Sequence, residues 1–249
     1  MTTRAEFLAR IRTQMGRTPG RFTAEPSPRP ERPRERFEVL RRELSERWQD
    51  NLQRFRHEFE RVGGVFHRVD VAAAVPAAIA RLAAERGARR VVAWHGEALG
   101  VDVAAPLLAE GLQASAAPAT EVEAAERSRR RALAADADLG VTGVDLAIAE
   151  TGTLILVSGA GRPRAASLLP PCHVAVFDRD ALVASLLQAG LALEAWHDGA
   201  APGTRGASIN FITGPSRTAD IELTLTRGVH GPREVHAVFV EQGLAPRRG

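Results

Sequence analysis

Apolar positions in the first sixty residues follow a helical period and predict two helical segments. Residues 5–15 place Phe7, Leu8 and Ile11 on one side of a short amphipathic helix. Farther along, apolar side chains recur every three or four positions over residues 37–62. This spacing predicts one helix of about seven turns that stops at Gly63 and Gly64. The stripe consists of Phe37, Leu40, Leu44, Trp48, Leu52, Phe55, Phe59 and Val62.

The stripe on the longer helix needs a surface to pack against. One interpretation is packing onto the rest of the chain, and the other is an interface with a second copy or a partner. We favour packing within the chain, because so many apolar anchors are more than a freely exposed helix carries.

From residue 65 onward, strand-like segments alternate with helical ones. This alternation predicts a helix-flanked, mostly parallel sheet, with an antiparallel element where two strands lie close together within residues 146–158. Ligands in this class bind outside the carboxyl ends of the strands. The predicted strands cover residues 65–69, 90–94, 139–141, 146–149, 154–158, 173–177, 209–213 and 235–240. The predicted helices cover residues 75–86, 103–110, 121–135, 181–188 and about 218–226.

The length and composition suit an α/β domain with an appendage. A chain of 249 residues with 45% hydrophobic content can bury a full core. We predict a helical extension over residues 1–62, with a proline-rich linker at 16–34, followed by the α/β domain over 63–249. No apolar run reaches the roughly 18 to 20 residues that span a bilayer, and the N-terminus lacks an apolar signal region. We therefore expect a cytoplasmic protein without a membrane span.

Two absences narrow the chemistry. All 33 basic residues are arginines, so this chain offers no lysine for a Schiff base or a Walker-type phosphate loop. The single cysteine, Cys172, cannot supply the four thiolates of an iron–sulfur cluster or form an internal disulfide. Histidine and carboxylate spacings typical of metal sites are missing, as is the dinucleotide-binding glycine pattern. We predict no metal and no cofactor bound by this chain.

The net charge of +3 is unevenly distributed along the chain. Residues 1–68 hold 16 arginines against 10 acidic residues, whereas the remainder holds 17 against 20. Such a basic segment can bind nucleic acid. Acidic residues interrupt it throughout, however, so we favour a solvated helix face and predict no nucleic-acid partner.

A first group of candidate site residues lies between residues 150 and 173. Glu150, Thr151, Gly152 and Thr153 form a turn between two strands. The carboxylate there is either a cap or ion-pair partner of Arg162 or Arg164, or a reactive group that orients substrate. The loop over residues 159–171 is either a connector or an anion clamp built from its arginines, with Ser167 beside them.

Cys172 and His173 follow this loop at the start of a predicted strand. A satisfied structural histidine is commoner at such a position than a catalytic one, and we favour that interpretation for His173. Nothing near Cys172 in the sequence indicates a nucleophile, so we interpret it as a small buried residue.

A second group lies in the polar, glycine-punctuated run over residues 212–232. Gly214, Ser216, Arg217 and Thr218 are predicted to join a strand to a helix, whose exposed N–H groups would form an anion site. Asp220 and Glu222 cannot face one ligand from mid-helix, because about 200° separates positions two apart. His230 then lies on a loop from which its imidazole can reach a cleft.

Several of these motifs together resemble the LUD domain family and, within it, the lactate utilization protein C group (LutC, YkgG). They are Glu150-Thr151-Gly152-Thr153, Arg164 with Ser167-Leu168-Leu169-Pro170 and His173, Gly214 to Glu222, and Gly228-Val229-His230-Gly231-Pro232. The resemblance runs in order from about Phe55 to Glu241. It implies a fold similar to the group of glucosamine-phosphate isomerase, ribose-phosphate isomerase and CoA transferases (NagB/RpiA/CoA-transferase-like).

The resemblance also implies a function. Members oxidise L-lactate to pyruvate beside two iron–sulfur proteins, LutA and LutB, so clusters are expected on LutA- and LutB-like partners rather than on this chain. Glu150 and His230 would be catalytic. The small anionic substrate, such as L-lactate, would be bound by Thr151, Gly152, Thr153, Arg164, Ser167, Gly214, Ser216, Arg217, Thr218 and Asp220.

Two other functions stay open at this stage. One is a stand-alone enzyme, similar to a CoA transferase or a sugar-phosphate isomerase, that acts on a small anionic metabolite with Glu150 as nucleophile or base. The other is a regulatory module that only binds a ligand.

Overall fold

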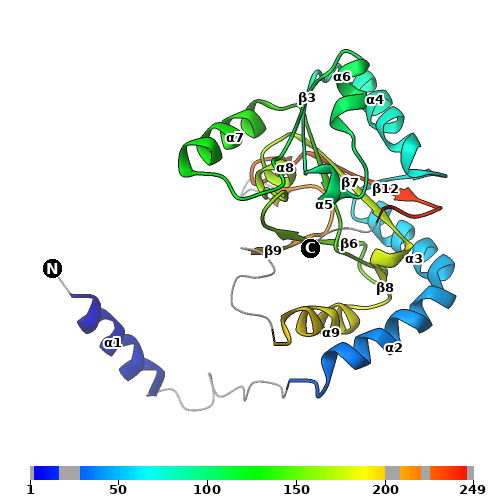
Figure 1. The fold of residues 1–249 in the computed structure, drawn as a ribbon. Helices are drawn as coiled ribbons and strands as arrows, with labels where there is room; N and C mark the ends of the chain where they lie inside the picture. The colour runs from blue at the N-terminus through cyan, green and yellow to red at the C-terminus, as the bar shows by residue number, and fades with distance from the viewer. Residues whose placement is uncertain (1–2, 17–28, 200–207, 220–224, 246–249) are drawn as a thin grey trace. The chain divides into compact units, whose positions relative to one another are not determined.

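A parallel sheet of six strands lies at the centre of the computed structural model, which describes residues 3–16, 29–199, 208–219 and 225–245 (Figure 1). All neighbouring strands in this sheet run parallel. In spatial order the strands are β1 (Val65–Val69), β12 (Glu234–Val240), β7 (Cys172–Asp178), β4 (Leu139–Gly143), β2 (Arg90–Ala93) and β3 (Gln113–Ala116). The predicted mostly parallel α/β fold is therefore confirmed, although β3 was not predicted.

One face of this sheet is covered by helices that follow β1 and β2. They are α4 (Val75–Arg86), α5 (Gly96–Leu99) and α6 (Ala104–Ala109), with the short 3-10 turn η1 (Ala72–Ala74) before them. Helix α4 buries Val75, Ile79 and Leu82 against the sheet, as its apolar spacing predicts. Gly87 ends α4 in a left-handed conformation, with φ of 62°, and so confirms the predicted stop.

The other face packs against a second, smaller sheet and α3 (Trp48–Arg61). The strands of this sheet, in spatial order, are β8 (Leu182–Val183), β5 (Leu146–Ile148), β6 (Thr153–Ser158) and β9 (Ser208–Ile212). Strand β6 pairs with β5 on one side and with β9 on the other, and both pairings are antiparallel. This confirms the predicted antiparallel element. Strand β8 pairs with β5 in parallel.

The predicted single helix over residues 37–62 is wrong, because the structure contains two helices. Helix α2 (Pro33–Glu46) and α3 meet at Arg47, whose φ of −117° and ψ of 22° are not helical. The two halves of the apolar stripe pack on different surfaces, which requires a change of direction. Leu52, Phe55 and Phe59 of α3 are buried against the central sheet, whereas α2 packs on α9 (Leu186–His197). The predicted packing within the chain is confirmed.

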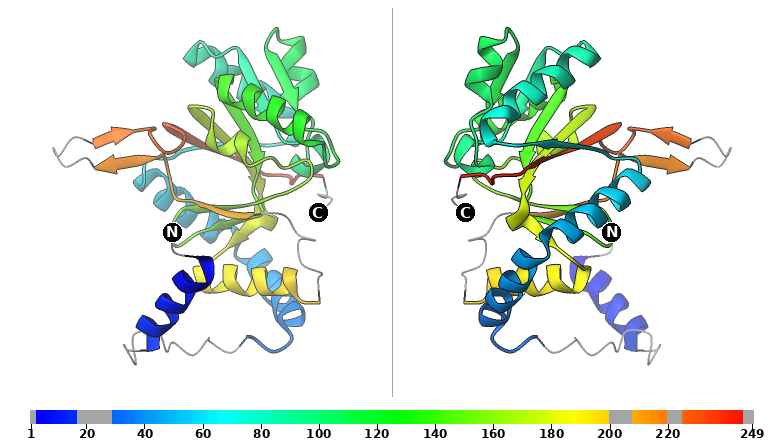
Figure 2. Two further views of the ribbon diagram at one scale, coloured as in Figure 1. Left: turned by 90° about the vertical axis from the view of Figure 1, so that its left-hand side faces the viewer. Right: turned by 90° about the vertical axis from the view of Figure 1, so that its right-hand side faces the viewer.

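The predicted helix near residues 218–226 is also wrong. Strands β10 (Arg217–Ala219) and β11 (Leu225–Arg227) pair there as an antiparallel hairpin that projects from the sheets (Figure 2). The sequence between residues 218 and 226 alternates β-branched or apolar residues with polar ones, a period of two that favours strands. Farther back, the turn η2 (Arg179–Ala181) and β8 precede α9, so the helix predicted at 181–188 begins later, after the cap Ser185.

Two further helices lie between these strands in the chain, α7 (Ala124–Asp136) after β3 and α8 (Ala165–Leu168) after β6.

The chain divides into two units, Met1–Glu31 and Arg32–Gly249. The first contains α1 (Arg4–Gly16), which confirms the predicted short helix. Most of the predicted linker lies outside the described residues. None of the described helices has the length and apolarity that crossing a membrane requires.

Candidate functional site

A pocket of about 530 Å³ opens beyond the carboxyl ends of β2 and β3. Residues 92–93, 115 and 117–118 form its floor, α7 forms one wall, and residues 159–161 and 163–166 form the opposite wall. This is the place where ligands bind in parallel α/β sheets. Among the predicted site residues that the structure describes, Arg164 is the one that lines it.

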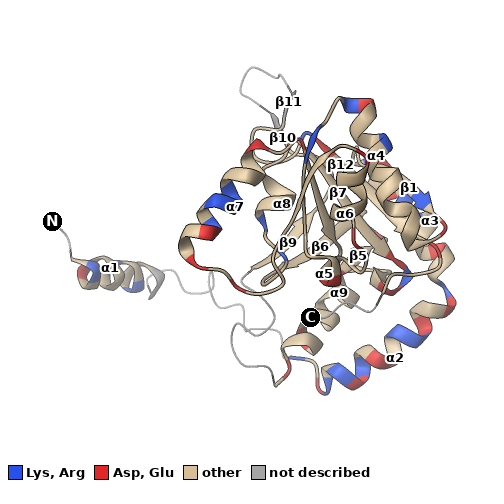
Figure 3. Cartoon of the chain, turned by 45° about the horizontal axis from the view of Figure 1, so that its top comes forward, with Lys and Arg blue, Asp and Glu red and all other residues tan. Residues whose placement is uncertain are grey.

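Four arginines line the pocket against one glutamate, Glu121. Three of them lie on α7, where basic residues gather as Figure 3 shows, and Arg164 precedes α8 on the opposite wall. Arg127 and Arg131 are four positions apart and therefore share one face of the helix. Their guanidinium groups and that of Arg164 are exposed and have no hydrogen-bond or ion-pair partner among the described residues.

The fourth arginine, Arg130, holds the helix in place. Its Nε lies 2.7 Å from Glu126 Oε1, and its guanidinium donates a second hydrogen bond of 2.8 Å to the carbonyl oxygen of Ala116. Ala116 is the last residue of β3. The position of α7 is thus fixed to the end of the strand that forms the pocket floor.

The loop before α8 is fixed from the other side of the pocket. Arg162 donates to Asp145 over 3.0 Å and lies over the ring of Trp94, whose indole nitrogen donates to the carbonyl oxygen of Pro163. Arg162 is therefore an anchor, whereas Arg164 lines the pocket. The predicted anion-clamp loop does border a pocket, and its ligand stays a prediction.

Helix α8 sits unusually close to β4. An added Cβ at Gly140 would lie 1.8 Å from the carbonyl oxygen of Ala166, so this contact is open only to glycine. Ser167 is buried, and its hydroxyl donates to the carbonyl oxygen of Arg164 over 3.0 Å. The geometry gives Ser167 a role in forming the α8 turn; its predicted part in anion binding stays a prediction.

The turn containing Glu150 lies away from this pocket. The carboxylate of Glu150 accepts a hydrogen bond of 2.5 Å from the backbone N–H of Leu186, at the start of α9. Gly152 has φ of 61°, and an added Cβ would lie 2.3 Å from the backbone nitrogen of Phe59 on α3. The capping interpretation of Glu150 thus has direct geometric support, and its catalytic role stays a prediction.

The threonines of this turn form a short hydroxyl chain. The hydroxyl of Thr151 donates to that of Thr153 over 2.8 Å, and Thr153 is 2.8 Å from the hydroxyl of Thr213 at the end of β9. These hydrogen bonds join the first predicted group of site residues to Thr213, which belongs to the second group.

The second group is held mainly by backbone contacts near the end of α3. Arg217 donates to the carbonyl oxygen of Val62, which lies beside Gly214. Ser216 exchanges backbone hydrogen bonds with Pro232 and Gly228, and its hydroxyl accepts from the backbone N–H of His230.

The predicted anion site at a helix start has no helix to carry it, because β10 begins at Arg217. His230 has an exposed side chain. The side chain of Thr218 and all of Asp220 lie outside the described residues, so their predicted roles stay predictions.

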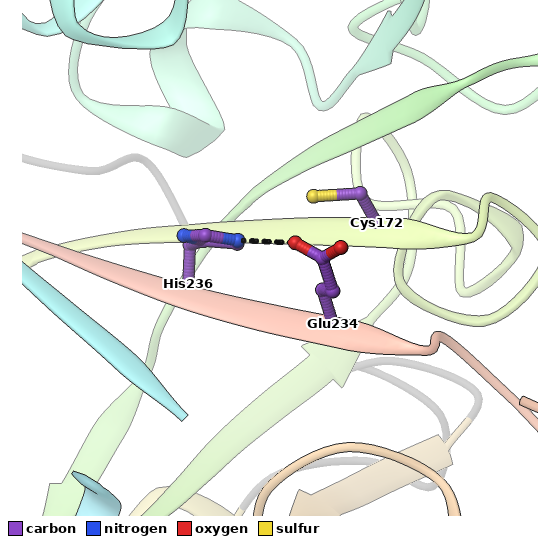
Figure 4. Close-up of side chains that lie close together, drawn as sticks. All are labelled: Cys172, Glu234 and His236. Atoms are coloured by element: carbon purple, nitrogen blue, oxygen red, sulfur yellow. Dashed lines mark hydrogen bonds and ion pairs between the residues drawn. The ribbon is translucent and has the colours of Figure 1, made fainter. Parts of the chain in front are cut away.

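A second cluster of chemically capable groups lies near the amino ends of β7 and β12. It was not predicted, because Cys172 is about 60 positions away from Glu234 and His236 in the chain. The sulfur of Cys172, a carboxylate oxygen of Glu234 and a ring nitrogen of His236 lie within 4.8 Å of one another (Figure 4). His67 of β1 adds a ring nitrogen 2.9 Å from Nδ1 of His236. Thiolate, carboxylate and imidazole are zinc ligands, so the donor set alone suits a metal ion.

A protein cation already occupies the position between these groups. The guanidinium of Arg86, from the last turn of α4, lies 2.8 Å from Glu234 and 3.2 Å from Nε2 of His236. Burial, with the Glu234 charge adding to it, raises the pKa of Cys172 to about 12, so the thiol holds its proton at neutral pH. Burial also lowers the pKa of His236. A metal ion would have to displace Arg86 and that proton, so we interpret the cluster as structural.

His173 and Cys172 are both buried, as we favoured from the sequence. Nε2 of His173 lies 2.8 Å from the hydroxyl of Thr142, whereas Nδ1 has no hydrogen-bond partner among the described residues. Burial, and then the nearby His236, lower the pKa of His173 to about 3. The imidazole is therefore neutral at physiological pH.

Sequence reasoning missed Arg127 and Arg131. They lie in a run of four arginines within the five residues 127–131, a pattern typical of a solvated helix face. Their spacing of four positions, on a helix that follows a strand end, was the signal available.

Comparison with known proteins places this arrangement in a family. The model of the LUD domain matches residues 52–240. Lactate utilization protein C of Halalkalibacterium halodurans is 45% identical over 109 residues, or 43% of this chain and 46% of that protein. The protein of that name from Shouchella clausii is 41% identical over 106 residues, or 42% of this chain and 44% of that protein. The matched segment thus spans about half the length of these curated relatives.

A solved structure extends the similarity to most of the chain. The crystal structure of a DUF162 family protein from Deinococcus radiodurans is 25% identical, with a TM-score of 0.50, and the match covers 80% of this chain and 98% of that one. Because the family model spans the central sheet, the smaller sheet and both groups of motif residues, the chain belongs to the LUD domain family.

Proposed function

We propose that this protein acts in lactate utilization, as the component without a cluster in an iron–sulfur-dependent system that oxidises L-lactate to pyruvate. The observation that carries the proposal is the identity of 45% and 41% to two proteins named lactate utilization protein C. The matched segment spans less than half of each relative, so activity, substrate and partners are all part of the proposal.

The division of labour follows from the cysteine count. Oxidation of L-lactate to pyruvate releases two electrons and two protons, and an iron–sulfur cluster that accepts electrons is commonly held by four thiolates. This chain has one cysteine, whose buried thiol has a pKa of about 12. Clusters therefore belong on LutA- and LutB-like partners, to which this chain would contribute binding and positioning.

The test is reconstitution of lactate oxidation from separately purified components. Reduction of an electron-accepting dye by L-lactate should require this chain together with both cluster proteins, and each omission should lower the rate at least tenfold. Full activity of the two cluster proteins without this chain, or of this chain alone, would contradict the proposal.

The same assay examines the predicted catalytic residues. If Glu150 and His230 act on substrate, Glu150→Gln and His230→Gln should each lower the maximal rate by at least tenfold. Arg129→Gln is the matched control, because that side chain is 77% exposed on the solvent side of α7 and lies outside the pocket. Unchanged rates for both variants would show that neither residue is catalytic, and Glu150 would then act only as the helix cap described above.

A further inference from the structure

We propose that the arginine-lined pocket beyond β2 and β3 binds a nucleotide-sized organic phosphate. This goes beyond the proposed function, because L-lactate is a three-carbon acid with a single negative charge. The inference rests on three properties of the pocket: its volume, the distribution of its cations, and the apolar character of its floor.

The volume argues against a three-carbon ligand. Pockets of roughly 300 to 1,000 Å³ enclose drug-sized molecules, and this one has about 530 Å³. A water molecule takes up about 30 Å³, so a small hydroxy acid would leave most of the space to solvent. A nucleotide fills a pocket of this size.

The cations argue for more than one negative charge. Arg127 and Arg131 lie one helical turn apart on α7, about 6 Å between their Cβ atoms, and Arg164 faces them from the other wall. Each planar guanidinium can bind a phosphate or carboxylate through two parallel hydrogen bonds. A single carboxylate would satisfy one or two of these groups, whereas a diphosphate has enough oxygens for all three.

The floor argues for an organic body attached to those charges. The apolar lining residues are small: Val92, Ala93, Ala117 and Pro118 lie on the floor, Ala134 lies on α7, and Pro163 lies on the opposite wall. Inorganic phosphate alone would leave this surface in contact with water. A base or another flat ring would cover it and remove this apolar surface from water, which favours binding.

The frame of the pocket is already fixed before any ligand arrives. Arg130 ties α7 to the end of β3, and Arg162 ties the opposite loop to Asp145. Two arginines are thus committed to the protein itself, and three are left facing the pocket. Such preorganisation lowers the ordering cost of binding.

Isothermal titration calorimetry of the purified full chain tests this proposal. The probes are ADP, UDP and FMN, which share phosphate and differ in the attached ring. At least one should bind with saturation and a Kd below 1 mM. Adenosine, pyrophosphate and L-lactate should each bind at least tenfold more weakly than the best nucleotide. Absence of saturation with all three nucleotides, or binding of pyrophosphate or L-lactate as tight as the best nucleotide, would overturn the proposal.

Variants on both walls show whether binding occurs in this pocket. Arg131→Gln on α7 and Arg164→Gln before α8 should each weaken nucleotide binding about tenfold, while circular dichroism and the melting temperature stay as in the unchanged protein. Arg129→Gln, on the same helix but outside the pocket, should leave the Kd within twofold. Equal weakening by all three variants would indicate unspecific attraction to a basic surface and would overturn the assignment.

The outcome is separable from that of the proposed function. Binding is measured on this chain alone, without cluster proteins and without L-lactate turnover. Reconstitution can therefore fail while nucleotide binding and its loss in Arg131→Gln persist, and the reverse result is equally readable.

Discussion

The two ends of the parallel sheet both place arginines among polar groups, yet they treat the charge in opposite ways. At the amino ends of β7 and β12, the guanidinium of Arg86 is enclosed by Glu234 and His236, with distances of 2.8 and 3.2 Å. At the carboxyl ends of β2 and β3, three exposed arginines line a pocket. Their guanidinium groups have no hydrogen-bond or ion-pair partner among the described residues. A cluster whose hydrogen bonds are already satisfied stabilises the fold, whereas unsatisfied cations around a preformed pocket are available to a ligand.

The largest effect is expected from a change that moves a wall of the pocket. Gly140→Ala would place a methyl group 1.8 Å from the carbonyl oxygen of Ala166, so α8 must shift away from β4. We expect a loss of about 3 kcal/mol or more in the free energy of unfolding. Urea denaturation measures it. A loss below about 1 kcal/mol would mean that α8 moves freely and that the pocket frame is not rigid.

A smaller loss is expected at the satisfied cluster. Arg86→Gln removes the hydrogen bonds to Glu234 and to the carbonyl oxygen of Leu82, and leaves the buried His236 without its cation. We expect a loss of about 1–2 kcal/mol in the free energy of unfolding, since Glu234 is partly exposed. Arg81→Gln, at an exposed position of the same helix, should stay within about 0.5 kcal/mol. Equal effects of the two changes would remove the distinction between the two ends of the sheet.

The buried histidine gives the amino-end region a pH dependence. The pKa of His173 is lowered from 6.5 to about 3, so below pH 6.5 the unfolded chain binds a proton that the folded chain does not. Stability should therefore fall as pH falls from about 6.5 toward 3, by up to about 1.4 kcal/mol per pH unit for this group.

Thermal denaturation between pH 7 and 4 measures the slope. His67 and His236, whose pKa values burial also lowers, act in the same direction. His173→Gln should reduce the slope, because it removes the group whose pKa burial lowers most clearly. An unchanged slope in His173→Gln would show that another group titrates.

The smallest effect on stability is expected at the pocket. Arg131→Gln should change the free energy of unfolding by less than about 0.5 kcal/mol, because no described group depends on that guanidinium. Urea denaturation of Arg131→Gln and of Arg86→Gln under the same conditions compares the two losses in the free energy of unfolding directly. A loss of more than 1 kcal/mol would mean that Arg131 has a structural partner, and the contrast between the two ends would fail.

Elements with a strong local period could be predicted, and those set by distant contacts could not. Helix α4 and the strands rich in valine follow from their spacing, because one buried face repeats along each. The break at Arg47 could not be predicted, since it arises where α2 and α3 pack on different surfaces. The short strands β10 and β11 carry polar residues at spacings that suit a helix start equally well.

The candidate site divides in the same way. Arg164 could be identified, because its loop carries arginines between two strands. The pairing of Glu150 with the start of α9, 36 positions later, could not. Nor could the approach of Cys172, Glu234 and His236, which comes from neighbouring strands in the sheet rather than from spacing along the chain. The predicted site residues therefore all came from recognisable motifs. The arginines of α7, which line the pocket, belong to no motif and were not predicted.

One contact described above provides an optical measurement. Trp94 is 2% exposed, its indole nitrogen is 3.2 Å from the carbonyl oxygen of Pro163, and the Arg162 guanidinium lies 5.8 Å from the centre of its ring. Indole emission responds to hydrogen bonding and to nearby charge. Movement of the loop that borders the pocket would therefore change the fluorescence of Trp94, so that ligand titrations can be followed without adding a label.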